Sequence, residues 1–279
     1  MMIRCIQKKL TITAIVTALG LLASELGAGH PDGSAKPITE AAEAPSPDAF
    51  WIPQIGHGTA GSNQFSTDFS FINLSNTTAV LEITTFSGDG SPADLLRVEG
   101  FPGPAVASSA LQTVVDGKGM VQARSLSPDP ENELIDGWAK VSTQGKIGVE
   151  VVFRIVDAST GQLTTSANIR VGPLTTAASL LAVVDPPINT GVAILNPPTN
   201  PGEATVVIEV LNSSGTFVGT ASLKLVPGQK VAQFLDKLVP GLSAHFSGSV
   251  DIRSDLPVAV LPLRQEGVVL TTQDTFPGR

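Results

Sequence analysis

Two stretches of the chain, TDFSFINLS (residues 67–75) and TGVAILNP (190–197), share an order of residues that decides how the fold is interpreted. A threonine opens the match in both, an asparagine closes it, and the offset between them is 123 residues. Apolar residues occupy alternate positions in between, which is typical of β-strands with one buried face. The match predicts that the chain is built twice from one plan of strands.

The likeness continues beyond these two strands with small changes of offset. Two additional residues in the second copy move the offset to 125, where Gly90 meets Gly215. The same offset places FPG (101–103) on VPG (226–228). A series of matches in the same order predicts an internal duplication.

A further block of likeness sets residues 137–154 against 248–264, and both blocks end in an arginine. We expect each arginine to find an acidic or carbonyl partner within its own copy. Before this block the first copy carries residues 125–136, which we interpret as an insertion. The second copy carries AQFLDKLVPGL (232–242), whose apolar spacing and terminal Pro-Gly predict a helix. Such differences between copies are expected in connections between strands.

The pattern of residue types from residue 50 onward predicts an all-β fold. Short runs rich in Val, Ile, Thr and Phe are separated by Gly, Pro, Asn, Asp and Ser. We predict two tandem antiparallel β-sandwiches of immunoglobulin-like or related topology, residues 50–172 and 173–279. One larger sandwich shared by both copies is the alternative.

The N-terminus has the pattern of a secretory signal peptide. Three basic residues precede the apolar run TITAIVTALGLLA (11–23), and small residues follow it. The run is shorter than the ~20 residues of a membrane span. We predict a signal peptide over residues 1–28, cleaved near Ala28, and a flexible linker rich in Pro and Ala over residues 29–49. The mature protein would be secreted or periplasmic, with no membrane span.

Composition limits the partners of the mature chain. Removal of residues 1–28 takes away three of the 17 basic and one of the 25 acidic residues, which leaves a formal charge of −10. That charge disfavours binding to nucleic acid and to anionic lipid. The one cysteine, Cys5, is removed with the signal peptide, so core burial alone must stabilise the fold.

The second copy resembles a group of secreted bacterial β-sandwich repeats whose function is uncharacterised. The resemblance implies fold and location, and it transfers no catalytic residue. Gly137-Trp138-Ala139 and Phe153-Arg154 of the first copy fit it similarly. The residues that carry it in the second copy are TGVAILNP (190–197), VPG (226–228), QFLDKLVPGL (233–242), SDLPVA (254–259) and LRQ (263–265).

Nothing in the sequence has the spacing of a catalytic or metal-binding motif. The three histidines, His30, His57 and His245, lie far apart, and no HExxH, CxxC or GxSxG occurs. A triad assembled from distant loops stays open, because triads are spatial arrangements. We therefore assign no catalytic residue, no cofactor and no metal ligand, and we predict that the protein is not an enzyme.

Two features are candidates for ligand contact. Trp51 lies at the start of the predicted first sandwich, where an exposed ring could stack on a sugar. The acidic segment around Asp129, Glu131 and Glu133 offers oxygen ligands of the kind that calcium takes, although its spacing matches no known calcium loop. For Trp138, which opens a strand, we expect burial.

The function that these observations favour is an exported, non-enzymatic binding or structural module at the cell envelope or outside the cell. Its partner would be another protein or a cell surface. The alternatives are a glycan- or calcium-dependent binding module and, with less support, a small hydrolase whose site lies in the loops.

Overall fold

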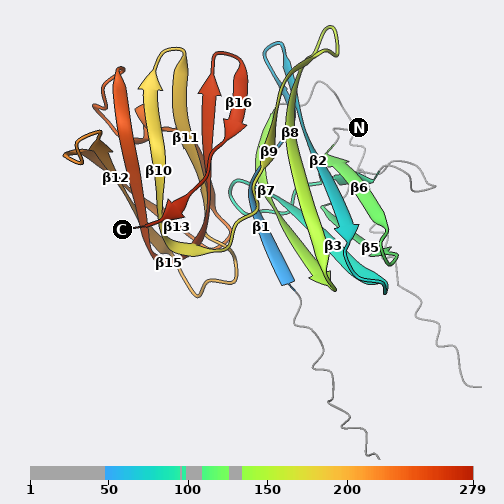
Figure 1. The fold of residues 1–279 in the computed structure, drawn as a ribbon. Coiled ribbons are helices and arrows are strands. Elements are labelled where there is room, and N and C mark those ends of the chain that lie inside the picture. The colour runs from blue at the N-terminus through green and yellow to red at the C-terminus, as the bar shows by residue number, and fades with distance from the viewer. Residues whose placement is uncertain (1–47, 95, 99–108, 126–133, 279) are drawn as a thin grey trace, which may run out of the picture. The chain divides into compact units, whose positions relative to one another are not determined.

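The structure of the protein is a computed structural model that describes residues 48–94, 96–98, 109–125 and 134–278. It confirms the all-β prediction. Two antiparallel sheets, of nine and eight strands, contain nearly all the regular elements (Figure 1). The described residues belong to one compact unit.

The first nine strands pair only with one another among the described residues. One layer has the order β5-β3-β7-β1, and the other has β4-β6-β2-β8-β9. Strand β1 passes between them, because it pairs with β7 as far as His57 and with β2 from Gly58 onward. The strands are β1 (Asp48–Ala60), β2 (Asn63–Asn73), β3 (Ala79–Ser87), β4 (Leu96–Val98), β5 (Ala110–Val115), β6 (Met120–Ser125), β7 (Ile135–Gln144), β8 (Ile147–Asp157) and β9 (Leu163–Ile169).

The second half of the chain forms the other sheet. The first part of the long strand β15 pairs with β10 and β12, and its last part pairs with β11 and β16, so β15 runs through both layers. The elements are β10 (Thr175–Asp185), β11 (Ile188–Leu195), β12 (Ala204–Asn212), β13 (Phe217–Leu225), β14 (Lys230–Phe234), α1 (Leu235–Leu238), β15 (Phe246–Glu266), β16 (Val269–Thr272) and β17 (Phe276–Pro277).

The two halves use the same pairing scheme. β2 pairs with β6 and β8 as β11 pairs with β14 and the end of β15, and β3 pairs with β5 and β7 as β12 pairs with β13 and the start of β15. The immunoglobulin-like or related topology stays a prediction. Gly90 and Gly215 both adopt positive φ in the turns after β3 and β12. The internal duplication itself stays a prediction, and this scheme is what it would produce.

The strand pairing disagrees with part of the predicted alignment of the two copies. Ala79 pairs with Val115 as Ala204 pairs with Leu225. The offset is therefore 125 residues at β3 and 110 residues at β5. An alignment that keeps 125 through this region does not follow the hydrogen bonding.

Because the offset falls between β3 and β5, the residues that the first half has in addition to the second lie between these two strands. The interpretation of residues 125–136 as an insertion was therefore wrong. Thr143 and Ser254, which take equivalent places opposite β3 and β12, are 111 residues apart, so the offset changes by only one residue across that segment. The misleading match was Pro-Gly in 101–103, which lies outside the described residues. Pro-Gly recurs in many turns, so it is a weak guide to register.

The predicted helix over residues 232–242 is much shorter in the structure. Only Leu235–Leu238 is helical, and the preceding residues form β14, which pairs with β11. The apolar residues are nevertheless buried as the helical spacing requires, since Leu235 and Leu238 lie in the second core. Pairing with an existing strand satisfies the backbone of β14, so local helical spacing did not decide its structure.

The matched asparagines Asn73 and Asn196 are fully buried and close equivalent turns. Asn73 Nδ2 donates to the Val115 carbonyl at 3.0 Å, and Asn196 Nδ2 donates to the Leu225 carbonyl at 2.7 Å. Each also donates to a carbonyl of the turn that follows it. These bonds satisfy backbone groups where the strands leave the sheet, as expected for asparagine in turns.

Each half has its own hydrophobic core, and the first core extends into the second half. The first is centred on inward residues such as Phe69, Phe71 and Leu81, and it also includes Ala193 and Leu261. The second is built from inward residues of β10, β11, β12 and β15 with α1. Burial of apolar surface thus joins the two halves as well as filling each one.

Candidate functional site

A buried lysine of the second half forms hydrogen bonds with residues of the first half. The Lys230 side chain on β14 is 1% exposed. Its Nζ donates to Asp136 Oδ1 at 2.5 Å, to Gln54 Oε1 at 2.7 Å and to the Gly137 carbonyl at 2.9 Å. All three ammonium donors are therefore used by the first half. Burial lowers the pKa of Lys230, and the Asp136 carboxylate opposes that shift.

Two turns meet beside this lysine. The backbone N–H of Lys230 donates to the Gly88 carbonyl at 3.0 Å. Gly90, with a φ of 89°, lies so close to Gly228 that a Cβ on Gly90 would come within 2.9 Å of the Gly228 carbonyl oxygen. Glycine is thus required there both for backbone conformation and for the close approach.

Aromatic residues form the apolar part of the junction. Trp51 and Trp138 belong to one buried cluster with Leu195 and Ala259 of the second half. Trp138 is fully buried, as the sequence predicted, and stacks on Phe86 with ring centroids 4.0 Å apart. Trp51 is 5% exposed, with its ring against Trp138 and the Lys140 ammonium over it. It therefore presents no open ring face to a sugar in this structure.

A cavity of about 430 Å³ lies at the same junction. Its walls come from β1, β2, β8, β9 and the start of β7 in the first half, and from β11, β14, β15 and β16 in the second. Val268, which is 67% exposed, is among the lining residues, so the cavity reaches the surface there. The other lining residues are Gln54, Asn63, Phe65, Leu134, Asp136, Phe153, Ile155, Thr164, Gly191, Val192, Ala232, Gln233, Phe234, Leu263, Gln265, Gly267 and Leu270.

The position of Phe153 in this cavity depends on Gly56. A Cβ on Gly56 would come within 2.4 Å of the Phe153 ring. Thr67 holds Gly56 in place, since its Oγ1 accepts from the Gly56 N–H at 3.0 Å and lies 3.2 Å from the Gly56 carbonyl. The strand that changes layers is thereby packed directly against the cavity wall.

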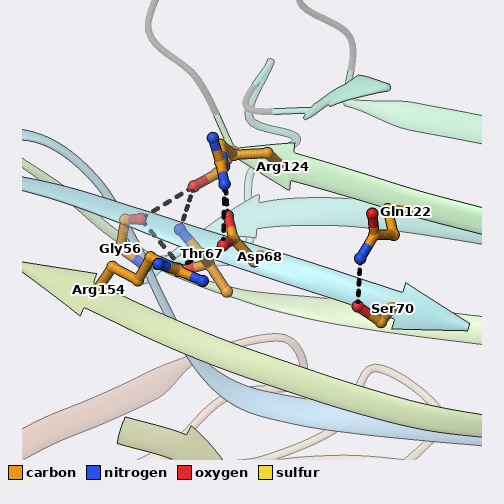
Figure 2. A network of polar contacts seen from close by, with 8 residues as sticks. Gly56, Thr67, Asp68, Ser70, Gln122, Arg124 and Arg154 are labelled. Atoms are coloured by element: carbon orange, nitrogen blue, oxygen red, sulfur yellow. Dashed lines mark hydrogen bonds and ion pairs between the residues drawn. The ribbon is translucent and has the colours of Figure 1, made fainter. Parts of the chain in front are cut away.

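A second cluster of polar residues lies on the outer face of β2, β6 and β8 (Figure 2). Asp68 accepts from Arg124 on β6, and its Oδ2 lies 2.5 Å from Arg154 Nε on β8. A hollow of about 320 Å³ is lined by these residues and by Ser70, Gln122 and Glu150. Both arginine side chains are more than a third exposed, so the ion pairs contribute modestly to stability. We interpret the cluster as a set of ion pairs that links strands β2, β6 and β8.

The expectation for the matched arginines is confirmed. Arg154 pairs with Asp68, and Arg264 Nη2 lies 3.6 Å from Glu266, each within its own half. The acidic turn around Asp89 has a structural role too. Asp89 Oδ1 accepts from the Ser91 N–H and from two serine hydroxyls, which lowers its pKa to about 2.

The acidic segment considered for calcium is not described by the structure, so its role stays a prediction. Asp129, Glu131 and Glu133 lie outside the described residues, as does His30. Within the part of the chain that the structure describes, no group of three or more His, Cys, Asp and Glu residues could hold a metal ion. His245 is exposed and pairs with Asp185 at 2.7 Å.

His57 is the one histidine of the described residues that is buried, and it predicts a pH dependence of stability. Among the described residues, its side chain forms no ion pair, and neither ring nitrogen has a hydrogen-bond partner of good geometry. Burial lowers its pKa from 6.5, with weak opposition from the Ser125 backbone. The unfolded chain therefore binds the proton more tightly, and the free energy of unfolding should fall as the pH drops below 6.5 toward the lowered pKa.

Urea unfolding between pH 7.5 and 5 measures this slope. The variant His57→Leu should have a flatter profile than the wild type over that range. Phe217→Leu, which alters an exposed ring and removes no titratable group, is the matched control and should keep the wild-type slope. Equal slopes for wild type and His57→Leu would contradict the assignment.

Sequence reasoning missed the residues that make the junction. Gln54 and Lys230 carried no motif, and Asp136 was grouped with the acidic segment considered for calcium. The signal that was present is a single lysine within the otherwise apolar-patterned run KVAQF (230–234). A lysine buried there needs a partner for its charge.

Comparison of the chain with protein-family models, with curated proteins and with solved structures finds no match. The resemblance to secreted bacterial β-sandwich repeats therefore stays a prediction. Among the described residues, no helix is long and apolar enough to cross a membrane.

Proposed function

We propose that the protein is an exported, non-enzymatic binding protein whose ligand occupies the cavity at the junction of its two halves. The observation that carries this proposal is the cavity itself. Its volume of about 430 Å³ lies within the range of ligand pockets, ~300–1,000 Å³. Its lining combines aromatic and aliphatic side chains with a few amide groups, which is the composition of small-molecule sites.

Contacts from several elements hold the walls of the junction cavity, which favours binding. The Lys230 bonds, the tryptophan cluster and two bonds between β9 and β16 fix the walls: Leu270 N–H donates to Thr165 Oγ1 at 3.1 Å, and Thr272 Oγ1 donates to the Asn168 carbonyl at 2.7 Å. A preformed site loses little conformational freedom when a ligand enters. The export part of the proposal is supported by the signal-peptide pattern of residues 1–28.

The test is binding of a neutral fluorescent probe, Nile red, to the full chain purified after export. The wild type should bind the probe, and Ala232→Trp, which places an indole in the cavity, should weaken binding at least about tenfold. Ala221→Trp on β13 is the matched control, because Ala221 is also partly buried but does not line the cavity. It should bind as the wild type does.

Two results would contradict the proposal. One is an absence of probe binding by the folded wild type, or equal binding by Ala232→Trp. The other concerns export. Sequencing of the exported protein should begin close to Gly29, and recovery only of a cytoplasmic chain that keeps residues 1–28 would overturn that part.

A further inference from the structure

We propose that the ligand of the junction cavity is an uncharged amphipathic molecule, with an apolar body and a hydroxyl or amide end. This inference rests on the proposed function and names the class of ligand. It is carried by the chemistry of the cavity wall, which combines apolar side chains with neutral polar ones and has no unpaired charge among the described lining residues.

The apolar part of the lining consists of aromatic rings and branched aliphatic side chains. The rings of Phe65 and Phe153 lie 6.0 Å apart and are tilted by 52°. Ile155 of the first half and Leu263 and Leu270 of the second continue the surface. Four of these five residues pack against the first core and are only partly buried, which leaves apolar area for a ligand to cover. Covering it removes apolar surface from water, which favours binding.

The polar part of the wall consists mainly of amides and a hydroxyl. Gln265 Nε2 donates to the Gly267 carbonyl, and the Gln54 amide is used by Lys230 and Asp136. Asn63 and Gln233 carry amides that can donate and accept, and Thr164 carries a hydroxyl. A hydroxyl or amide group of a ligand would exchange its bonds to water for bonds to these groups. Because a hydroxyl or amide end group is neutral, it also needs no counter-charge in the cavity.

The charge of the wall decides against an ionised ligand. Asp136 is the one ionisable residue among the described lining residues, and the Lys230 ammonium neutralises it at 2.5 Å. Gln54 Nε2 also donates to Asp136 Oδ1 at 2.7 Å. A carboxylate in the cavity would find no free cation, and an ammonium would compete with Lys230 for the same oxygen. Either charge would lose hydration without a paired partner.

The volume limits the size of the ligand. The cavity of about 430 Å³ lies within the ~300–1,000 Å³ of pockets that bury drug-sized molecules. Decan-1-ol, decanoate and decylammonium fit this limit, share an unbranched alkyl chain and carry a neutral, an anionic and a cationic end group. They form a matched series for the test.

The experiment measures displacement of Nile red from the wild-type full chain at neutral pH, with each compound below the concentration at which it aggregates. Decanol is expected to displace the probe at a concentration at least about tenfold lower than decanoate or decylammonium. Ala232→Trp should abolish the displacement curve, and Ala221→Trp should keep the order of the three compounds.

The outcomes separate the inference from the function on which it rests. Equal displacement by all three compounds, or preference for either ion, would overturn the uncharged class and leave the cavity as a binding site. Probe binding that is insensitive to Ala232→Trp would overturn both. Displacement by decanol alone, lost in Ala232→Trp and kept in Ala221→Trp, supports both.

Discussion

Replacing Asp136 with alanine is expected to lower the free energy of unfolding by about 3–5 kcal/mol, because it leaves the buried Lys230 ammonium without its counter-charge. Lys230→Met should cost less than half as much. In that variant the buried site receives an apolar chain, and Asp136, whose side chain is 46% exposed, turns to water. The asymmetry follows from which partner of the pair is buried.

Urea unfolding of the two variants at neutral pH measures the difference. Lys224→Met is the matched control, since Lys224 is 71% exposed and pairs with a partly exposed glutamate, and it should change stability by less than about 1 kcal/mol. The double variant Asp136→Ala with Lys230→Met should recover much of the loss caused by Asp136→Ala. A larger cost for Lys230→Met than for Asp136→Ala would contradict this account.

The pH dependence of Asp136→Ala gives a second readout of the same cause. Burial lowers the pKa of Lys230 below its usual 10.5, so the folded protein binds that proton less tightly than the unfolded chain does. Stability then rises with pH. Without Asp136 to oppose the shift, the free energy of unfolding should increase as the pH is raised from neutral toward 10.5, and it should do so more steeply than in the wild type.

The strands could be predicted from the sequence because their residues alternate. Inward positions such as Phe69, Phe71, Ile194 and Val206 carry large apolar side chains, and a turn residue such as Asn73 marks where a strand ends. Those signals are local, and local patterns suffice for antiparallel strands joined by short turns. The all-β prediction and the burial of Trp138 followed from them.

The candidate site could not be predicted because its residues meet only in three dimensions. Gln54, Asp136 and Lys230 are separated by 82 and 94 positions, and each alone is an ordinary polar residue. The cavity is a gap between side chains of both halves, and no periodicity encodes it. Trp51 illustrates the limit: its type suggested ligand contact, while its neighbours Leu195 and Ala259, far along the chain, cover it.

The same tryptophan cluster carries the second large effect. Trp138→Ala is expected to lower the free energy of unfolding by about 3–5 kcal/mol, the usual cost of truncating a buried tryptophan. Trp138 is fully buried, stacks on Phe86 and packs with Leu195 of the second half. Because it contacts residues of both halves, its loss should weaken the coupling between them as well as each core.

Urea unfolding followed by two probes distinguishes these effects. In the wild type, tryptophan fluorescence and far-ultraviolet circular dichroism should report one coincident transition. In Trp138→Ala, fluorescence of the remaining Trp51 should change at lower urea than circular dichroism, because the junction opens before the second core unfolds. Phe217→Ala, which truncates an aromatic ring that is 57% exposed, is the control and should keep coincident transitions within about 1 kcal/mol of wild-type stability. Coincident transitions in Trp138→Ala would show that the cluster stabilises the protein without coupling its halves.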